Sequence, residues 1–270
     1  NLSFFVCQFI NILCYNLIGD NMIVRNNYNE CLTNLACSIR KYFELDYKHN
    51  TLDYIDRILD EYKPKNVVTI LCDGMGSNII DKMLPQDSFL IKNRLKPITT
   101  VFPATTVAAT TSVMTGLNPC ETGMLGWHMY YKELDKIIAT FLHTEKANNR
   151  GIPLAEAREY KQKYMVTKSI MEQINEVGKY KAYSLFPFGS GAYNSLDELF
   201  EMIEEKCNED GNKYIYVYDD EPDHTMHEIG CDRDEVKDII VDLDDRIEKL
   251  SNKLTDTIIF VIADHGHYNI

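Results

Sequence analysis

The sequence predicts an α/β fold in which a mostly parallel sheet is covered by helices on both faces. Apolar, β-branched runs such as "VVTILC" (67–72) lack the alternation of a half-exposed strand, as expected for strands buried on both faces. Segments with helical spacing separate these runs along the chain, which favours parallel strands. The length of 270 residues is enough for one large domain with a sizeable core.

The expected elements follow one another in chain order. The helix at 104–116 opens on hydroxyl residues that can cap its first turn, and it closes at Gly116. Residues 128–165 are mixed and polar, and we expect them to form an inserted cap or a substrate-facing region. The remaining elements are helices at 51–62, 169–178, 195–207 and 233–254, and strands at 67–72, 181–186, 213–220 and 257–264.

The composition narrows the class of partner. The net charge is −13, from 28 basic and 41 acidic residues. Binding to a nucleic-acid backbone needs clusters of Lys and Arg, so we do not expect nucleic acid as the main partner. A small phosphorylated substrate remains compatible with this charge, because a bound cation can supply positive charge locally.

The N-terminal segment bears on the location of the protein. Its first 19 residues are apolar but interrupted by polar residues, without a basic region or a clear cleavage site, so neither a signal peptide nor a membrane span is expected. Met22 follows closely, and we interpret residues 1–21 as a leader or an added segment and 22–270 as the folded domain. The 8 scattered cysteines form no CxxC pair, which favours reduced thiols and a cytoplasmic protein. The apolar N-terminus leaves export as the alternative.

Three carboxylates lie at or just beyond the ends of predicted strands. Asp73 follows "TILC", Asp264 follows "FVIA", and Asp223 lies in "EPDHTMH" after the strand at 213–220. Ligands of parallel α/β sheets bind outside the carboxyl ends of the strands. We therefore expect these three side chains to meet at one edge of the sheet.

Imidazoles accompany two of these carboxylates. Asp223 and His227 are spaced so that one helical turn places them on the same side, and His265 directly follows Asp264. Carboxylate and imidazole together suit zinc and, less well, manganese. One such pair alone would more readily be a capped turn with a solvated histidine. Two pairs together with Asp73 indicate a metal site.

Other polar residues nearby are left out of the predicted site. We interpret Asp219, Asp220 and Glu221 as a solvated acidic turn, and His128 and His143 as surface or hydrogen-bonded histidines.

The segment "FPATTVAATTSVMTG" supplies a candidate nucleophile. A hydroxyl at the start of a helix faces unpaired N–H groups and the positive end of the dipole, an arrangement that suits phosphate. Metal coordination would activate a threonine hydroxyl. Taken alone, Thr105 or Thr106 would more readily be a helix cap, but five metal-ligand candidates favour a catalytic role.

Four motifs in this order carry a resemblance: "VVTILCDGMGSN", "FPATTVAATTSVMTGLNP", "EPDHTMHEIG" and "IIFVIADHGH". Together they resemble the alkaline phosphatase superfamily, and within it the type I phosphodiesterase/nucleotide pyrophosphatase family. The resemblance implies an alkaline phosphatase-like three-layer α/β/α sandwich and two divalent ions, zinc before manganese. It also implies that 22–270 is a catalytic domain.

The resemblance assigns roles to particular residues. The nucleophile follows a Tyr/Phe-Pro-x-x-Thr pattern, which selects Thr106. One metal would be held, together with the nucleophile, by Asp73, Asp264 and His265. The other would be held by Asp223 and His227.

The sequence departs from the family pattern in two places. The family's second metal takes a further histidine well beyond the "DHG" motif, and the sequence ends at Ile270, so we expect an incomplete C-terminus and a weak second site. Trp127 stands where many relatives have an asparagine that holds the phosphoryl group.

The predicted function is metal-dependent hydrolysis of phosphodiesters or nucleotide pyrophosphate bonds through Thr106. The partner would be a small phosphorylated substrate, with nucleotides among the candidates. A phosphomonoesterase or phosphotransfer enzyme of the same superfamily, an inactive phosphate-binding fragment and a purely structural α/β domain remain as alternatives.

Overall fold

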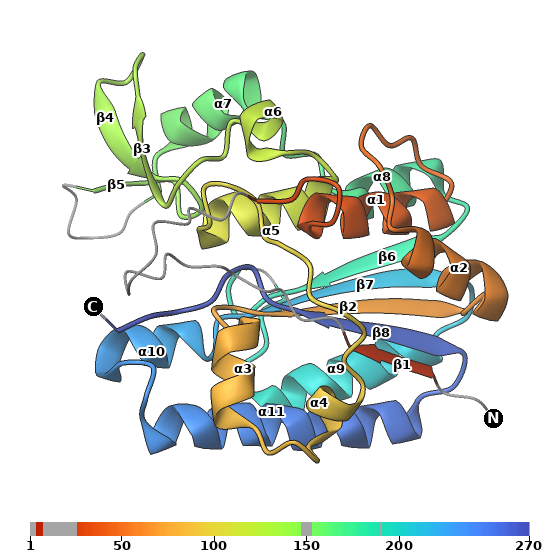
Figure 1. The fold of residues 1–270 in the computed structure, drawn as a ribbon. Coiled ribbons are helices and arrows are strands. Elements are labelled where there is room, and N and C mark those ends of the chain that lie inside the picture. The colour runs from red at the N-terminus through yellow and green to blue at the C-terminus, as the bar shows by residue number, and fades with distance from the viewer. Residues whose placement is uncertain (1–3, 8–25, 147–152, 190, 270) are drawn as a thin grey trace.

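The main sheet of the protein is entirely parallel. The computed structural model describes residues 4–7, 26–146, 153–189 and 191–269, and their main sheet has five strands in the order β1-β8-β2-β7-β6 (Figure 1). Every neighbouring pair in this sheet is parallel. The strands are β1 (Phe4–Cys7), β2 (Asn66–Cys72), β6 (Lys181–Leu185), β7 (Lys213–Asp219) and β8 (Thr257–Ile262).

Helices cover both faces of this sheet, so the three-layer α/β/α sandwich expected from the sequence is confirmed (Figure 1). One layer contains α1 (Leu32–Tyr42), α2 (Asp53–Tyr62), α5 (Thr106–Thr115) and α8 (Ile170–Val177). The opposite layer contains α3 (Ser77–Met83), α4 (Phe89–Lys92), α9 (Leu196–Asn208), α10 (Asp223–Ile229) and α11 (Asp234–Lys253).

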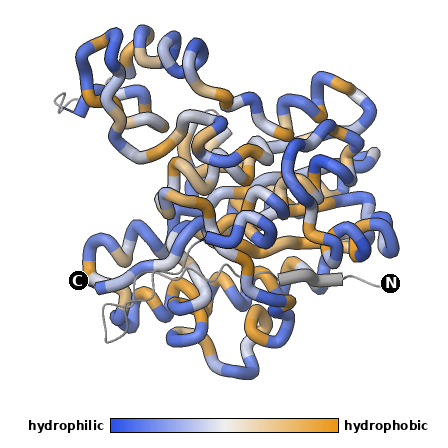
Figure 2. The backbone as a smooth tube through the Cα atoms, turned by 45° about the horizontal axis from the view of Figure 1, so that its top comes forward, coloured by the Kyte–Doolittle hydropathy of each residue, from blue (hydrophilic) through white to orange (hydrophobic). Residues whose placement is uncertain are grey.

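The core lies on both sides of the central strands. Along β2, Val67 and Leu71 pack in the cluster that includes α1, α5 and α8, whereas Val68 and Ile70 pack in the cluster with α3, α9 and α11. Each such fully buried side chain stabilises the fold by about 1.5–3 kcal/mol. Figure 2 shows that the middle of the molecule, where the strands run, is largely hydrophobic. The continuous apolar runs of the sequence are explained by this double-sided burial.

The predicted elements agree closely with the observed ones. Helix α5 has Thr105 as its N-cap residue and ends at Gly116, whose φ of 73° lies in the left-handed region. Helix α8 is capped by Ser169, which accepts a hydrogen bond from the N–H of Glu172. These caps satisfy backbone groups that a helix end would otherwise leave unpaired.

Residues 128–146 and 153–165 form a small unit of their own beside α5. It contains β3 (His128–Tyr131), β4 (Lys136–Ala139) and β5 (Thr144–Glu145) in an antiparallel sheet, followed by α7 (Ala155–Tyr164); the short α6 (Pro119–Thr122) lies next to it in Figure 1. Val107 of α5 packs against Tyr131 and Ile138 in its core. These strands were not expected from the sequence, because they are only two to four residues long.

The N-terminal segment is described only in part. Phe4–Cys7 pairs with β8 as the edge strand β1; the rest of residues 1–21 lies outside the described residues, and their assignment as a leader stays a prediction. In the described ranges, no helix combines the length and hydrophobicity needed to cross a membrane.

Candidate functional site

The carboxyl ends of β2 and β7 are joined by backbone hydrogen bonds that bring the predicted site residues together. The N–H of Asp73 donates to the carbonyl of Asp219 at 2.9 Å, and the N–H of Asp223 donates to the carbonyl of Asp73 at 3.1 Å. Asp223 therefore starts α10 directly beside the end of β2.

A first group of side chains surrounds the start of α5. His265 Nε2 lies 3.2 Å from Asp73 Oδ1 and 3.6 Å from Asp264 Oδ2. The hydroxyl oxygen of Thr106 lies 3.1 Å from His265 Nε2 and 3.5 Å from Asp73 Oδ1. The Thr106 hydroxyl, Asp73 and His265 are thus close enough together to contact one small cation or phosphoryl oxygen, and Asp264 lies beside His265.

Backbone contacts orient the ligands of this first group. His265 Nδ1 lies 3.0 Å from the carbonyl oxygen of Gly266, which can only accept, so Nδ1 carries the proton and Nε2 turns to the group. Asp264 Oδ1 accepts from the N–H groups of Gly74 and His265, at 3.1 and 2.9 Å. Its Oδ2 is buried and has no hydrogen-bond partner in the described structure.

A second group lies on the other side of Asp223. His227 Nε2 is 3.2 Å from Asp223 Oδ2, and His267 Nε2 is 3.8 Å from Asp223 Oδ1. The rings of His227 and His267 are 4.8 Å apart and perpendicular. Asp223 also has a carboxylate oxygen within 4.8 Å of ligand atoms of Asp73 and His265, so the two groups adjoin each other.

Glycines allow the loops of the site to approach closely. Gly74 has a φ of 69°, and a Cβ there would lie 2.8 Å from Asp223 Oδ1. A Cβ on Gly76 would lie 2.8 Å from the Cα of Gly266. Because real Cβ atoms do not come that close to another heavy atom, the Gly-Met-Gly turn after β2 makes room for both groups.

The electrostatics of the first group favour a cation. Burial, together with the charges of Asp264 and Asp223, raises the pKa of Asp73 well above its usual range. Burial lowers the pKa of His265, but the nearby Asp264 and Asp223 and the Gly266 carbonyl outweigh it, so that pKa is raised. Acidic side chains this close together in a buried site call for a nearby positive charge. A divalent cation fits this donor set, which also leaves Asp264 Oδ2 and Asp223 Oδ1 buried and unpaired among the described residues.

Tyr218 is a site residue that the sequence analysis missed. Its hydroxyl donates to Asp73 Oδ2 at 2.6 Å. In "YIYVYD" the tyrosines recur at every second position, and Tyr214, Tyr216 and Tyr218 all pack in the same layer of the core. That period of two places them on one face of β7, which could have signalled that the last of them lies near the sheet edge.

The expectation that Asp219 belongs to a solvated acidic turn is wrong, because Asp219 is buried. The hydroxyl of Tyr193 donates to Asp219 Oδ1 at 2.9 Å. Burial raises the pKa of Asp219 to about 7. Asp220 and Glu221 are half-buried, and Glu221 bonds to Thr225 of α10.

The threonines near the start of α5 face different partners. Thr106 is buried and directs its hydroxyl into the first group. Thr105 is the N-cap residue, but its side chain makes no capping hydrogen bond. Thr110 donates back to the carbonyl of Thr106 at 2.5 Å, as expected for a hydroxyl inside a helix.

The remaining aromatic and imidazole candidates lie near the surface. Trp127 is 41% exposed and makes an edge contact with Phe141. His128 is exposed, and His143 is half-buried.

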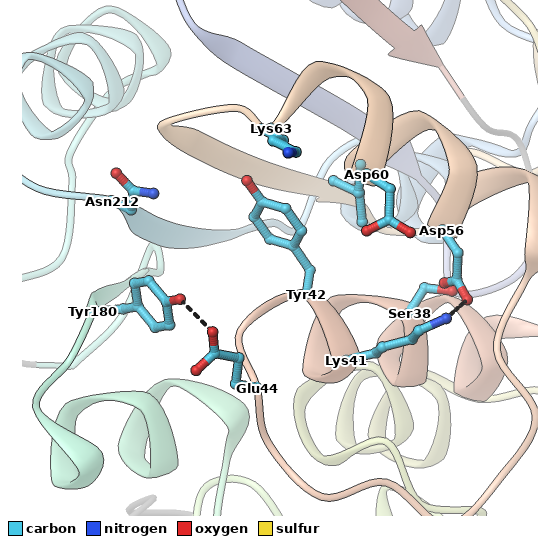
Figure 3. Close-up of a pocket in the computed structure, with 10 residues that line it drawn as sticks. Ser38, Lys41, Tyr42, Glu44, Asp56, Asp60, Lys63, Tyr180 and Asn212 are labelled. Atoms are coloured by element: carbon cyan, nitrogen blue, oxygen red, sulfur yellow. Dashed lines mark hydrogen bonds and ion pairs between the residues drawn. The ribbon is translucent and has the colours of Figure 1, made fainter.

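The described part of the chain has hollows as well, among them one that adjoins the second group and one that lies apart from both groups. One of about 450 Å³ opens beside His227, with Arg233 and Tyr268 in its wall. The other, of about 340 Å³, is lined by residues such as Tyr42 and Lys41 (Figure 3).

The hollow of Figure 3 lies at the opposite edge of the sheet. Two of its lining residues, Tyr180 and Asn212, directly precede β6 and β7 and therefore mark the amino ends of those strands. Within it, Lys41 pairs with Asp56, and the hydroxyl of Tyr180 donates to Glu44 (Figure 3). It is therefore separate from the candidate site, which lies at the carboxyl ends.

The chain is similar to a known protein family and to solved structures. The family model for type I phosphodiesterase/nucleotide pyrophosphatase matches residues 67–270. Among solved structures, the chain resembles murine ectonucleotide pyrophosphatase/phosphodiesterase 5 as an inactive variant in complex with AMP, with 18% identity, a TM-score of 0.51, and coverage of 74% of this chain and 56% of that one. A second structure of that murine protein gives 18% identity, a TM-score of 0.51, and coverage of 75% and 57%.

At this identity the resemblance shows the fold, and the chain spans little more than half the length of these neighbours. A sequence search of curated proteins finds no significant match.

Proposed function

Because the chain belongs to the type I phosphodiesterase/nucleotide pyrophosphatase family, we propose that it hydrolyses phosphodiester or nucleotide pyrophosphate bonds with Thr106 as the nucleophile. The observation that carries this proposal is the position of the Thr106 hydroxyl, 3.1 Å from His265 Nε2 at the start of α5. A threonine that merely capped the helix would not need to face a buried carboxylate and an imidazole.

The side chains of both groups fit divalent cations. Asp73, Asp264 and His265 would hold one and Asp223 and His227 another, and such ions supply positive charge that lowers the pKa of a hydroxyl and neutralises a phosphoryl group. The mixture of carboxylates and imidazoles favours zinc, with manganese as the alternative.

The residues around Thr106 would position the reacting phosphate. The first N–H groups of a helix have no partner within it, and at the start of α5, beside Thr106, they and the helix dipole would favour a phosphoryl oxygen. The bond between Thr106 Oγ1 and phosphorus forms as the bond from phosphorus to the leaving oxygen breaks, and the hydroxyl proton is released. Water then attacks phosphorus, which frees the second product and restores the Thr106 hydroxyl.

Membership in the family supports a proposal for the class of substrate. The AMP complex of the murine neighbour supports a nucleotide as one product, and thus a small nucleotide-containing diester or anhydride as substrate. A phosphomonoesterase or phosphotransfer reaction would use the same groups, and a binding module without turnover would need only the phosphate contacts.

The test compares bis(4-nitrophenyl) phosphate with 4-nitrophenyl phosphate in the presence of zinc and after chelation. We expect zinc-dependent release of nitrophenol with preference for the diester. Preference for the monoester would indicate that the chain is a phosphomonoesterase. Binding of phosphate without turnover of either compound would indicate a binding module.

A further inference from the structure

His267 lies where a third ligand of the second group would be. Its Nε2 is 3.8 Å from Asp223 Oδ1, and Asp223, His227 and His267 each offer a ligand atom within 4.8 Å of the others. Donor atoms around a tetrahedral zinc ion are about 3.3 Å apart, as bond lengths of 2.0–2.1 Å require. The three side chains therefore need only small rotations to share one ion.

Buried polar atoms of this group lack partners. Asp223 is 9% exposed, and its Oδ1 has no hydrogen bond in the described part of the chain. The same holds for His267 Nδ1. A buried oxygen or nitrogen without a partner costs free energy, and a cation beside Asp223 Oδ1 would remove that cost for the carboxylate.

The loop that carries His267 is held on both sides. Asn78 of α3 donates to the carbonyl of His267 at 3.0 Å, and the N–H of Cys231 donates to Asn269 Oδ1 at 2.9 Å. His267 is therefore placed before any ion binds. His224 is on the same helix as His227, but its side chain is 64% exposed and pairs with Glu228 at 3.8 Å.

We propose that His267 is a metal ligand and that it completes a second cation site with Asp223 and His227. The inference rests on the proposed function, because it adds a ligand to the site proposed above. The resemblance assigns only Asp223 and His227 of the described residues to this metal. With His267, the site has one carboxylate and two imidazoles, the three protein ligands that catalytic zinc sites usually have.

The donor set also selects the ion. Two imidazoles and one carboxylate favour Zn²⁺ and Co²⁺ over Mg²⁺, which prefers oxygen ligands. A position remains for a water or substrate oxygen, because His227 is 69% exposed at its side chain and opens to the adjoining hollow.

The experiment counts zinc ions bound to the 270-residue chain by equilibrium dialysis, with titration calorimetry for the affinities. The variants are His267→Gln, which keeps the volume but removes a good ligand, and His224→Gln as the matched control. Wild type and His224→Gln should bind two ions. His267→Gln should bind one zinc ion with unchanged affinity and the other with an affinity lower by more than about 100-fold. Even a residue that only orients a metal ligand contributes about 10–100-fold to metal affinity, so the loss of a direct ligand should cost more.

A second measurement tests the ligand role of His267 by spectroscopy and does not depend on catalytic activity. Co²⁺ bound to wild type should give the intense visible absorption of a four-coordinate ion. In His267→Gln and in His227→Gln, the part of this absorption that comes from the second site should be absent. Circular dichroism checks that each variant is folded.

Equal zinc affinity and an equal number of ions in wild type and His267→Gln would overturn the role of His267 and leave the proposed function standing. Absence of bound zinc in folded wild type would overturn both.

Discussion

The hydroxyl of Tyr218 donates a 2.6 Å hydrogen bond to Asp73 Oδ2, and this bond leaves Asp73 Oδ1 facing His265 and Thr106. Tyr218 comes from β7 and Asp73 from the end of β2, so the bond crosses two adjacent strands. It fixes the orientation of a carboxylate whose other oxygen is proposed to hold a metal.

Replacing Tyr218 with Phe should weaken the first metal site and lower activity without unfolding the protein. A partner that orients a metal ligand typically contributes 10–100-fold in affinity or activity, and we expect a loss in that range. Zinc titration and diester hydrolysis measure it. Tyr214→Phe is the control, because Tyr214 lies on the same face of β7 but bonds to Thr69 at 3.2 Å. Equal zinc affinity in both variants would contradict the orienting role.

Thr106→Ala should abolish nearly all diester hydrolysis, whereas Thr105→Ala should retain it. The Thr106 hydroxyl is buried in the first group, while Thr105 makes no capping hydrogen bond through its side chain. Both variants should fold, because even a lost cap costs only about 1 kcal/mol. The measurement is the steady-state rate of diester hydrolysis at saturating zinc. An inactive Thr105→Ala together with an active Thr106→Ala would disprove the assignment of Thr106 as the nucleophile.

Gly76→Ala should weaken metal binding by displacing the loop of His265 and His267. The added Cβ would lie 2.8 Å from the Cα of Gly266, and neither backbone can yield without moving the ligands. Gly126→Ala is a suitable control, because its Cβ would meet only the His128 carbonyl at 3.8 Å. Zinc titration and thermal unfolding of both variants measure the effect. Unchanged zinc affinity in Gly76→Ala would show that the loop tolerates the displacement.

Asp219→Asn should become more stable relative to wild type as the pH rises. Burial raises the pKa of Asp219 to about 7, so the folded state binds this proton more tightly than the unfolded chain does. The resulting stabilisation is fully present below about pH 4 and is lost as the pH rises through about 7. Asparagine removes this titration and can still accept from Tyr193.

Denaturant unfolding in the presence of a chelator, between pH 4 and pH 8, measures this difference. From pH 4 to pH 8, the free energy of unfolding of Asp219→Asn should rise relative to that of wild type by up to a few kcal/mol. A difference that does not change with pH would show that Asp219 is not protonated in the folded protein.

Zinc should raise the unfolding temperature of wild type, and chelation should reverse the rise. An ion that binds only the folded state adds about 2.7 kcal/mol at 100 times its dissociation constant. Asp264→Asn should reduce this rise, because Asp264 Oδ2 is buried and free to bind. A zinc response equal to that of wild type would exclude Asp264 as a ligand.

The sequence by itself determined the layers of the fold and the edge where the site lies. Runs such as that of β2 are apolar without alternation, and in a segment this short and rich in β-branched residues the pattern indicates a strand buried on both faces. Because parallel strands all end at one edge, Asp73, Asp223 and Asp264 could be placed together from their positions alone.

Contacts between distant segments were decided only by the tertiary structure. The burial of Asp219 depends on Tyr193, and the hydrogen bond from Tyr218 to Asp73 depends on the pairing of β2 with β7. His267 looks in sequence like a neighbour of the "DHG" motif, yet the fold turns it to Asp223. Local patterns report which face of an element is buried, but the partner of a polar side chain depends on which distant segment packs there, and that is a property of the whole fold.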